Sequence, residues 1–552
     1  MTGVLTVLLE KRTLATCVFK LFLTILIVIY KTYPAIESKK DVYMSQPATP
    51  VLANSATGLD ASVLIIGAGF SGMAMAIALQ KAGVDFIILE KGGDVGGTWR
   101  DNVYPGAACD VPSHMYCYSF EPNRWSRSFA AQPEIFDYTK NVAQKYQLYP
   151  HIRFNVEVTG AHYHDDNGTW QVDAADGQQF RARTVVSARG ALHIPSYPNI
   201  KGLHDFKGVT MHSAKWDHSV DLKGKRIAVI GTGASAIQVV PEMAKVASEL
   251  HVFQRTPAWV LPKADFAFKE ETKDKYDKSL LARKWYRNKI YWILEASAAG
   301  FVIDPRIMKY GQKLAYKNLQ RIKDEKTREA LTPNYTMGCK RVLLSNSYYP
   351  AFNQDNVHLV GGGVTEITEN SVMANGQEYP VDVIIYCTGF DVTNQANQFD
   401  ITGKHGKSIQ THWKNGMHAY LGISSYDFPN AFFLLGPNTG LGHNSIIFMI
   451  ESQASYIAQA LKYMKKHKLN TLEVKQESED NFVCDMQKQS DKSVWKSGCN
   501  SWYLDETGRN TTLWPSFTFM YWLKTRSFDP SRYTSEKKLP RLNPIKRLLA
   551  KV

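Results

Sequence analysis

The order of apolar runs along the chain predicts strands that alternate with helices. Short runs rich in β-branched residues span 62–66 and 86–89, and an Ala-rich stretch of helical character separates them. The same order recurs from residue 225 to residue 253. Because strands that alternate with helices form parallel sheets, we predict an α/β protein with two Rossmann-like nucleotide-binding domains.

A turn of small residues follows the first strand of each predicted domain. The turns contain Gly67, Gly69 and Gly72 in the first domain, and Gly231, Gly233 and Ala236 in the second. This spacing lets the backbone approach a pyrophosphate that lies on the N-terminus of the next helix. Each turn is therefore predicted to bind a dinucleotide.

The residue that ends the second strand distinguishes the two ligands. Glu90 stands 23 positions after Gly67, where a carboxylate can accept hydrogen bonds from ribose hydroxyls. The equivalent position after Gly231 holds the neutral Gln254, and Arg255 follows it. Because an arginine at this place accommodates a 2′-phosphate, we predict FAD in the first domain and NADPH in the second.

Three later strands, at 184–188, 381–386 and 431–435, each run into a turn that contains glycine. These turns are predicted to face a cofactor, and they include Thr388, Gly389 and Asn438. After the last turn, Ser445 can cap a long amphipathic helix that reaches Lys465.

Residues 263–332 are rich in Lys, Glu, Tyr and Trp and contain few helix breakers, which predicts a helical insertion. Its aromatic residues are expected to form a core rather than a substrate wall; they are Trp285, Tyr286, Tyr291, Trp292 and Phe301. The predicted organisation is then an apolar segment and polar leader at 1–60, an FAD-binding domain at 61–190 and 391–534, an NADP-binding domain at 191–262 and 333–390, the helical insertion at 263–332, and a basic tail at 535–552.

Composition excludes several classes of protein. Hydrophobic residues make up 44% of the 552 residues and charged residues 21%, which excludes a disordered chain. The net charge of +14 suits a nucleic acid, an anionic membrane or a phosphorylated cofactor. The glycine turns favour the cofactor, so no nucleic-acid partner is predicted.

The seven cysteines include no C-x-x-C pair and no cluster with histidine of the zinc-binding type. We therefore predict neither a disulfide framework nor a metal site, in a reducing compartment such as the cytosol. Cys109 and Cys387, which lie close to the motifs, are expected to be small packing residues.

Residues 14–30 are almost entirely apolar, although Lys20 interrupts them. A bilayer span needs about 20 residues, so this segment is a marginal membrane anchor, and the flanking charges weakly favour a cytoplasmic enzyme domain. A second interpretation starts translation at Met44, directly before a polar leader, and gives a cytoplasmic protein. Both interpretations stay open at this point, as does the oligomeric state.

Two longer motifs resemble the fingerprints of type I Baeyer-Villiger monooxygenases. The first is Gly96-Gly97-Thr98-Trp99, then Tyr104-Pro105-Gly106 and Asp110; the second is Phe206-x-Gly208-x-x-x-His212-x-x-x-Trp216-Asp217. Flavin N- and S-monooxygenases resemble the second motif but usually carry Tyr or Phe where Trp216 stands. The resemblance runs from about residue 60 to 525, and stretches near 436–445 and 495–505 are similar to the 4-hydroxyacetophenone monooxygenase-like group.

The resemblance implies an NADPH- and O₂-dependent enzyme that inserts one oxygen atom beside a ketone carbonyl, through a C4a-peroxyflavin, to give an ester or lactone. Arg341 would supply a fixed positive charge near the developing anion, and Asp110 would hold that arginine. The residues that would contact FAD in the first fingerprint are Gly97, Thr98, Trp99 and Asp110. Those that would bind the 2′-phosphate are Lys340, Arg255 and Thr256.

Other residues of the motifs are implied to couple the domains. If residues 212–217 are helical, His212 and Trp216 share one face, and they would transmit domain movement together with Asp217; a packed core pair is the alternative. Trp502 lies in a segment similar to the family's mobile loop, which closes over NADP.

Three other functions remain as alternatives. A flavin-containing N- or S-monooxygenase shares the cofactors and the layout. A pyridine nucleotide-disulfide reductase needs a C-x-x-x-x-C pair, whereas Cys109 and Cys117 are eight positions apart. A membrane-tethered nucleotide-binding protein has support only from residues 14–30 and the basic tail. The ketone itself is open among aryl, steroid, cyclic and long-chain compounds.

Overall fold

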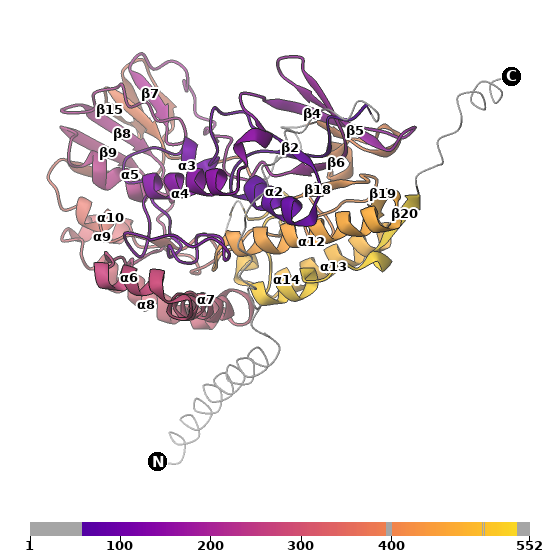
Figure 1. The fold of residues 1–552 in the computed structure, drawn as a ribbon. Helices are drawn as coiled ribbons and strands as arrows, with labels where there is room; N and C mark the ends of the chain where they lie inside the picture. Colours follow the sequence, from indigo (N-terminus) through magenta and orange to yellow (C-terminus); the bar gives the residue numbers. More distant parts are fainter. Residues whose placement is uncertain (1–57, 393–399, 499–500, 502, 538–552) are drawn as a thin grey trace, which may run out of the picture. The chain divides into compact units, whose positions relative to one another are not determined.

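The structure is a computed structural model that describes residues 58–392, 400–498, 501 and 503–537 (Figure 1). Two large sheets, three small sheets of two or three strands, a helical insertion and a C-terminal group of helices make up this part of the chain. The predicted apolar segment 14–30 and most of the basic tail lie outside it. No helix among the described residues is long and apolar enough to cross a membrane.

The first domain is built on an eight-stranded sheet whose central strands are parallel. The strands follow the order β17 (Asp400–Thr402), β4 (Val158–His164), β5 (Thr169–Ala174), β6 (Gln179–Ser187), β1 (Ala61–Ile66), β2 (Phe86–Leu89) and β3 (Ile152–Arg153), and β18 (Ala431–Phe433) also pairs with β6. Strand β1 is buried at every position except Ser62, as a parallel strand covered on both faces must be. The predicted strands at 62–66 and 86–89 are confirmed.

Helices α2 (Phe70–Ala82) and α12 (Ile446–His467) pack against each other beside this sheet (Figure 1). The prediction of a long helix after Ser445 is confirmed, because the Ser445 hydroxyl accepts a hydrogen bond from the Ile447 amide at the helix start. Other elements of the domain are α3 (Thr98–Asp101), α4 (Gln132–Lys145), α11 (Ile409–His412), α13 (Gln476–Ser490), α14 (Thr518–Thr525), β19 (Leu469–Val474) and β20 (Tyr533–Lys537).

The second domain has a five-stranded parallel sheet. Its strands follow the order β12 (Val357–Val360), β9 (Glu249–Phe253), β8 (Arg226–Ile230), β16 (Val383–Tyr386) and β7 (Val209–His212), with a meander of β13 (Glu366–Ile367), β14 (Ser371–Ala374) and β15 (Gln377–Pro380) and the helices α5 (Ala236–Met243) and α10 (Tyr348–Ala351). Tyr386 pairs in register with both Ile230 and His212. The turns that follow these strands therefore meet at one edge of the sheet, where parallel α/β sheets bind ligands.

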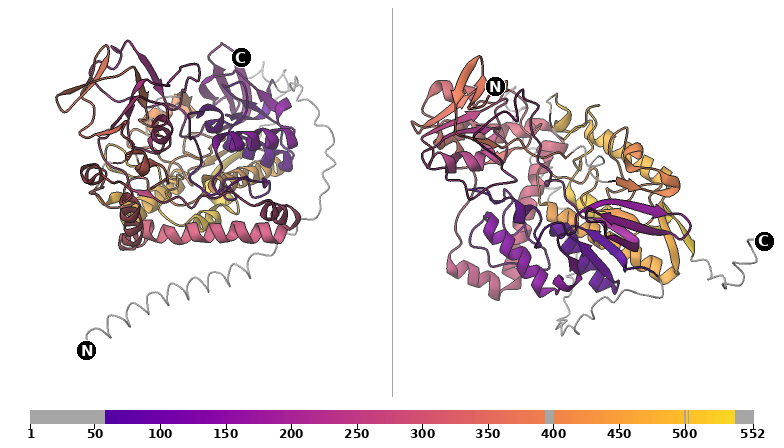
Figure 2. Two further views of the ribbon diagram at one scale, coloured as in Figure 1. Left: turned by 90° about the vertical axis from the view of Figure 1, so that its left-hand side faces the viewer. Right: turned by 90° about the horizontal axis from the view of Figure 1, so that it is seen from above.

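The helical insertion leaves and rejoins the second domain through a short pair of parallel strands, β10 (Val260–Leu261) and β11 (Leu343–Leu344). It contains α6 (Glu270–Lys278), α7 (Leu280–Val302), α8 (Met308–Leu319) and α9 (Glu325–Ala330). The predicted insertion at 263–332 falls inside this strand pair. Figure 2 shows α7 in its left-hand view as a long helix along one edge of the molecule.

The aromatic residues of α7 divide between two faces. Phe301 is buried, as expected, and Tyr291 contacts Thr518 of α14 through its hydroxyl. The expectation of a core position is wrong for Trp285, which is 67% exposed. Helical periodicity shows which residues share a face, but it does not show which face another element covers.

The described cysteines are mostly free thiols, namely Cys109, Cys117, Cys387 and Cys484. Cys109 and Cys387 are buried, as expected of packing residues. Cys339, by contrast, is disulfide-bonded, a bond that the prediction of no disulfide framework did not foresee. Sequence spacing did not reveal it, because a disulfide depends on distances between residues that only the fold sets.

Candidate functional site

A cavity of about 1730 Å³ collects most of the predicted site residues. Both glycine turns border it, as do the loop of the first fingerprint and the turn after β18, whereas no residue of the second fingerprint lines it. The predicted residues that line it are Gly67, Gly69, Glu90, Gly97, Thr98, Trp99, Asp110, Gly231, Gly233, Arg255, Thr256, Lys340, Arg341, Thr388 and Gly389. A cavity lined by both nucleotide turns can hold two ligands side by side.

The first glycine turn has the backbone geometry that a dinucleotide needs. Gly67 has a φ of +106°, which disfavours a larger residue, and a Cβ at Gly72 would lie 1.8 Å from the Gly67 carbonyl oxygen. The helix α2 therefore approaches β1 as closely as only glycine permits. No side chain caps the N-terminus of α2, so its first amides are available to an anion.

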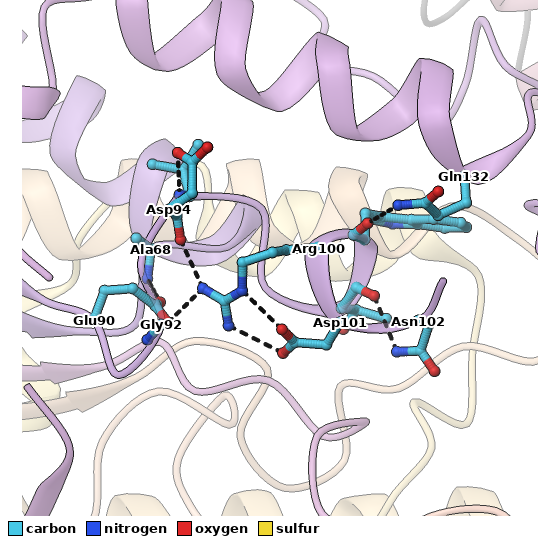
Figure 3. Close-up of polar contacts among 11 residues, drawn as sticks. Ala68, Glu90, Gly92, Asp94, Arg100, Asp101, Asn102 and Gln132 are labelled. Carbon is cyan, nitrogen blue, oxygen red and sulfur yellow. Dashed lines mark hydrogen bonds and ion pairs between the residues drawn. The ribbon is translucent and has the colours of Figure 1, made fainter. Parts of the chain in front are cut away.

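The Glu90 carboxylate is held by the protein itself (Figure 3). Its Oε2 accepts from the Ala68 amide at 2.7 Å, while Oε1 accepts from the Gly92 amide at 2.8 Å and from Arg100 Nη1 at 2.7 Å. Only 4% of Glu90 is exposed. If Glu90 also binds ribose hydroxyls, as predicted, it must do so with the carboxylate lone pairs that these three donors leave free.

Sequence reasoning missed Arg100. Its guanidinium also donates to both oxygens of Asp101 and to the Asp94 carbonyl, so it ties the fingerprint loop to the end of β2 (Figure 3). Burial alone would lower the pKa of Arg100. The hydrogen bonds and charges of Asp101 and Glu90 raise the pKa by more than burial lowers it, so the pKa lies above its ordinary value. Its place directly after Thr98-Trp99 was the available signal.

The second turn repeats the first with one difference. Gly231 has a φ of +114°, and its Cβ would lie 2.5 Å from the Cys387 carbonyl oxygen. At Gly233 nothing lies within 4 Å of an added Cβ, so this position opens onto free space. Ala236 is fully buried in the core of the second domain and packs the helix rather than lining the cavity. The turn therefore presents backbone, not side chains, to a ligand.

Two cations stand together at the cavity beside this turn. Arg255 is exposed. The pKa of Lys340 is lowered first by the burial of Lys340 itself and second by the charge of Arg255. Neither forms an ion pair with a carboxylate in the described part of the chain. Their binding of a phosphate, to which two neighbouring cations can donate charge-assisted hydrogen bonds, stays a prediction.

Arg341 and Asp110 form an ion pair that joins distant parts of the chain. Arg341 Nη2 lies 2.6 Å and Nε 3.2 Å from the same oxygen, Asp110 Oδ2. The Asp110 charge raises the pKa of Arg341 above its ordinary value despite burial, so the guanidinium keeps its proton. The side chains are 33% and 27% exposed, both toward the cavity that they line.

Tyr503 was missed by the sequence analysis and lies next to this pair. Burial raises the pKa of its hydroxyl to about 12, although the Arg341 charge lowers it. Tyr503 belongs to the same segment as Trp502, which was predicted to close over NADP. Trp502 itself lies outside the described residues. A neutral phenol beside the guanidinium adds a hydrogen-bonding group to the site.

The first fingerprint also links the two domains. The Tyr104 hydroxyl donates to Gln238 Oε1 at 2.8 Å, and Gln238 Nε2 donates to the Ala108 carbonyl at 2.9 Å. A Cβ at Gly106 would lie 2.6 Å from the Gln238 carbonyl oxygen, so the loop packs tightly on α5. Sequence reasoning gave this loop a role toward FAD alone.

We expect Tyr104→Phe to weaken this link without emptying the cavity. Loss of one hydrogen bond should lower the free energy of unfolding by about 1 kcal/mol, since the Gln238 amide oxygen loses its donor. Denaturant titration followed by fluorescence measures this change, and Tyr310→Phe, on an exposed tyrosine of α8, is the matched control. Equal stability of the two variants would show that the bond contributes nothing.

The second fingerprint does not form a helix, which corrects the suggestion that His212 and Trp216 share a helical face. His212 ends β7, and a turn follows it. Burial lowers the pKa of His212 to about 4, and its ring contacts Tyr197 and Phe390. Trp216 packs in the core of the second domain, and exposed Asp217 accepts from the amide and hydroxyl of Ser219 in a local turn.

The later turns differ in what they present. The Thr388 hydroxyl donates to the Ser196 carbonyl at 2.5 Å, and Gly389 has a φ of +85°, so this turn lines the cavity with backbone. Asn438 is buried, and its amide donates to the carbonyls of Asn510 and Leu513. The Asn438 side chain therefore shapes the loop that lines the cavity through Gly436, Pro437 and Gly440, and its contact with a cofactor stays a prediction.

Comparison with known proteins gives a consistent result. Residues 60–496 match a family described as Flavin-binding monooxygenase-like. A protein of Pseudomonas aeruginosa named Baeyer-Villiger monooxygenase is 44% identical over 91% of this chain and 95% of its own length. A protein of the same name from Streptomyces coelicolor is 42% identical over 85% of this chain and 92% of its own length.

Solved structures agree. A crystal structure of OTEMO in complex with FAD and NADP is 29% identical in sequence, covers 86% of this chain and 99% of its own, and superimposes with a TM-score of 0.78. A steroid monooxygenase bound to NADP has 28% identity, the same coverage and a TM-score of 0.78.

Proposed function

The chain belongs to the flavin-binding monooxygenase-like family, and from that premise we propose that it is an NADPH-dependent, FAD-containing monooxygenase that converts a ketone with O₂ into an ester or lactone. The observation that carries the proposal is the Arg341–Asp110 pair, a fixed positive charge at a cavity bordered by two dinucleotide turns. The resemblance of the two fingerprints, the relatives' names and the solved structures support the same reaction.

The residues of the two turns fit the two cofactors. The uncapped N-terminus of α2 and the glycines before it would bind the pyrophosphate of FAD. Arg255 and Lys340 would bind the 2′-phosphate of NADPH, which supplies the counter-charge that the protein lacks there. When bound, these cofactors supply the redox and oxygen chemistry, while the protein supplies position and charge.

Arg341 has the task of stabilising negative charge. Oxygen insertion beside a carbonyl develops an anion on oxygen, and an anion in a cavity poor in water needs a fixed cation. Asp110 holds the guanidinium by one oxygen only, so Arg341 keeps donors that can turn toward the reacting oxygen. We therefore assign Arg341 as the catalytic residue and Asp110 as its positioning residue.

The domain boundaries follow from the same assignment. We propose that residues 61–190 and 391–534 hold FAD and that residues 191–262 and 333–390 hold NADPH, with 263–332 as an insertion. A disulfide reductase is disfavoured because Cys109 and Cys117 are free thiols. Burial raises the pKa of both thiols, and a protonated thiol is a poor nucleophile. The comparisons give no support to an N- or S-monooxygenase over a ketone monooxygenase.

The proposal is tested with the purified full chain. It should carry FAD, and a panel of cyclic, aryl, steroid and long-chain ketones should contain members that accelerate NADPH oxidation and yield esters by mass spectrometry. Amines and sulfides in the same assay test the alternative. Oxidation of the heteroatom compounds without any ester from the ketones would refute the proposal.

Deleting residues 1–43 should leave flavin content and ketone-dependent NADPH oxidation unchanged. The first strand of the FAD-binding sheet begins only at Ala61, so no described element of the site is removed. Flavin absorbance and NADPH consumption measure the outcome, and comparing full-length and shortened protein in salt-washed membrane fractions tests membrane association separately. Loss of flavin on deletion would make the N-terminus part of the enzyme.

A further inference from the structure

Two histidines and a glutamate meet outside the cavity just described. His412 is the last residue of α11, His418 lies in the loop that follows, and Glu479 is in the first turn of α13. Their ligand atoms all lie within 4.8 Å of one another. None of the three lines the cavity, and the reaction proposed above uses none of them.

The atoms of this cluster face one another without bonding. His412 Nε2 is 3.6 Å and His418 Nε2 is 3.9 Å from Glu479 Oε1, beyond the length of a hydrogen bond. His412 Nε2 and Glu479 Oε1 are buried and find no hydrogen-bond partner among the described residues. The side chains of His412 and Glu479 are only 10% and 2% exposed. A buried carboxylate oxygen and ring nitrogen without partners are costly, and the fold keeps them together.

The neighbouring contacts fix the orientation of the cluster. His418 Nδ1 lies 2.9 Å from the Gly416 carbonyl, to which only a protonated nitrogen can donate, so Nε2 turns its lone pair toward Glu479. Glu479 Oε2 accepts from the Tyr426 amide at 2.7 Å, which leaves Oε1 for the cluster. A backbone carbonyl that sets the tautomer of a histidine is the usual partner of a metal-binding imidazole.

We propose that His412, His418 and Glu479 bind one divalent transition-metal ion, for which Zn²⁺ is the best match. Zinc bonds to His nitrogen and Glu oxygen at about 2.0–2.2 Å, so tetrahedral ligands lie roughly 3.4 Å apart. The observed separations need to contract by only a few tenths of an ångström at the glutamate. His418 is 19% exposed, which leaves room for a water molecule as fourth ligand.

The metal would tie two segments of the FAD-binding domain together. α11 and its loop carry Ile409, Trp413 and Met417, which line the cavity, whereas Glu479 comes from α13, none of whose residues lines it. The Trp413 indole already donates to the His418 carbonyl at 2.6 Å. A zinc ion between His412, His418 and Glu479 would therefore stabilise one wall of the cofactor cavity, without taking part in the reaction.

The experiment uses the untagged full chain with its flavin, stripped of metal by a chelator and then titrated with Zn²⁺ alone. We expect uptake of one zinc ion per chain, an upward shift of the unfolding midpoint, and slower amide exchange confined to residues 409–420 and 476–490. His412→Gln and His418→Gln should each weaken zinc binding at least ~100-fold, beyond the loss seen for ligand-supporting groups. His405→Gln, at an 80% exposed histidine nearby, should bind zinc normally.

Three outcomes would overturn the proposal. If the stripped wild-type chain takes up no zinc, the cluster is an ion pair only. If both glutamine variants retain zinc, the ion binds elsewhere. If zinc binds but leaves amide exchange unchanged in the two segments, its site is not this cluster, and this readout needs no variant. All these measurements are independent of NADPH oxidation, so failure of the proposed enzyme function would leave them interpretable.

Discussion

Arg341→Ala is expected to lower ester formation by about 10²–10³-fold, the usual loss when one preorganised donor to an oxyanion is removed. NADPH should still reduce the flavin in the absence of air, because the positive charge is needed only when negative charge develops on oxygen. In air, the electrons taken from NADPH should then reduce O₂ to hydrogen peroxide instead of forming ester. The measurement is ester formed per NADPH consumed, with hydrogen peroxide counted in parallel.

Two further variants separate charge from geometry. Arg341→Lys should rescue poorly, because an ammonium lacks the planar fork that keeps both Nε and Nη2 on Asp110 Oδ2. Asp110→Ala should resemble Arg341→Ala in milder form, because the guanidinium keeps its charge but loses its anchor. If Arg341→Ala retains near-normal ester coupling, the arginine is structural and the assigned mechanism is wrong.

Arg255→Ala is expected to erase most of the preference for NADPH over NADH. Loss of a charge-assisted hydrogen bond to the 2′-phosphate costs about 1.5–3 kcal/mol, or roughly 10- to 150-fold in kcat/KM for NADPH alone. NADH lacks this phosphate, so its kinetics should change little. Lys340→Ala should act in the same direction, since Lys340 stands close enough for Arg255 to lower its pKa.

The matched control is Lys225→Ala, which removes an exposed cation of the same domain just before β8, at the opposite end of that strand from the glycine turn. It should leave the ratio of kcat/KM for the two nucleotides unchanged. Equal use of NADPH and NADH by the unaltered protein would contradict the assignment of Arg255 directly.

The sequence alone determined what depends on local geometry. The turns at Gly67 and Gly231 were recognisable because both need positive φ angles and close backbone approach, which restrict the residue type. The long helix after Ser445 was recognisable from its cap, and the helical insertion from its lack of breakers. In these places a few consecutive residues settle the conformation, whatever the rest of the chain does.

Other features depend on which surfaces the fold covers or turns inward. The outward position of Trp285 on α7 and the hydrogen bonds of the Asn438 amide to the Asn510 and Leu513 carbonyls are of this kind. So is the pairing of Glu90 with Arg100, which occupies lone pairs that the sequence pattern reserves for ribose. Neither periodicity nor a motif contains this information, since it belongs to the contacts between elements.

Only the tertiary structure shows how the residues of the site are brought together. Asp110 and Arg341 are 231 positions apart, and the resemblance to a family suggested their partnership where spacing could not. The cluster of His412, His418 and Glu479 had no signal at all, because its third ligand comes from a separate helix. Short-range backbone constraints are written into neighbouring residues, whereas ion pairs and ligand sets form only where packing brings distant side chains within a few ångströms.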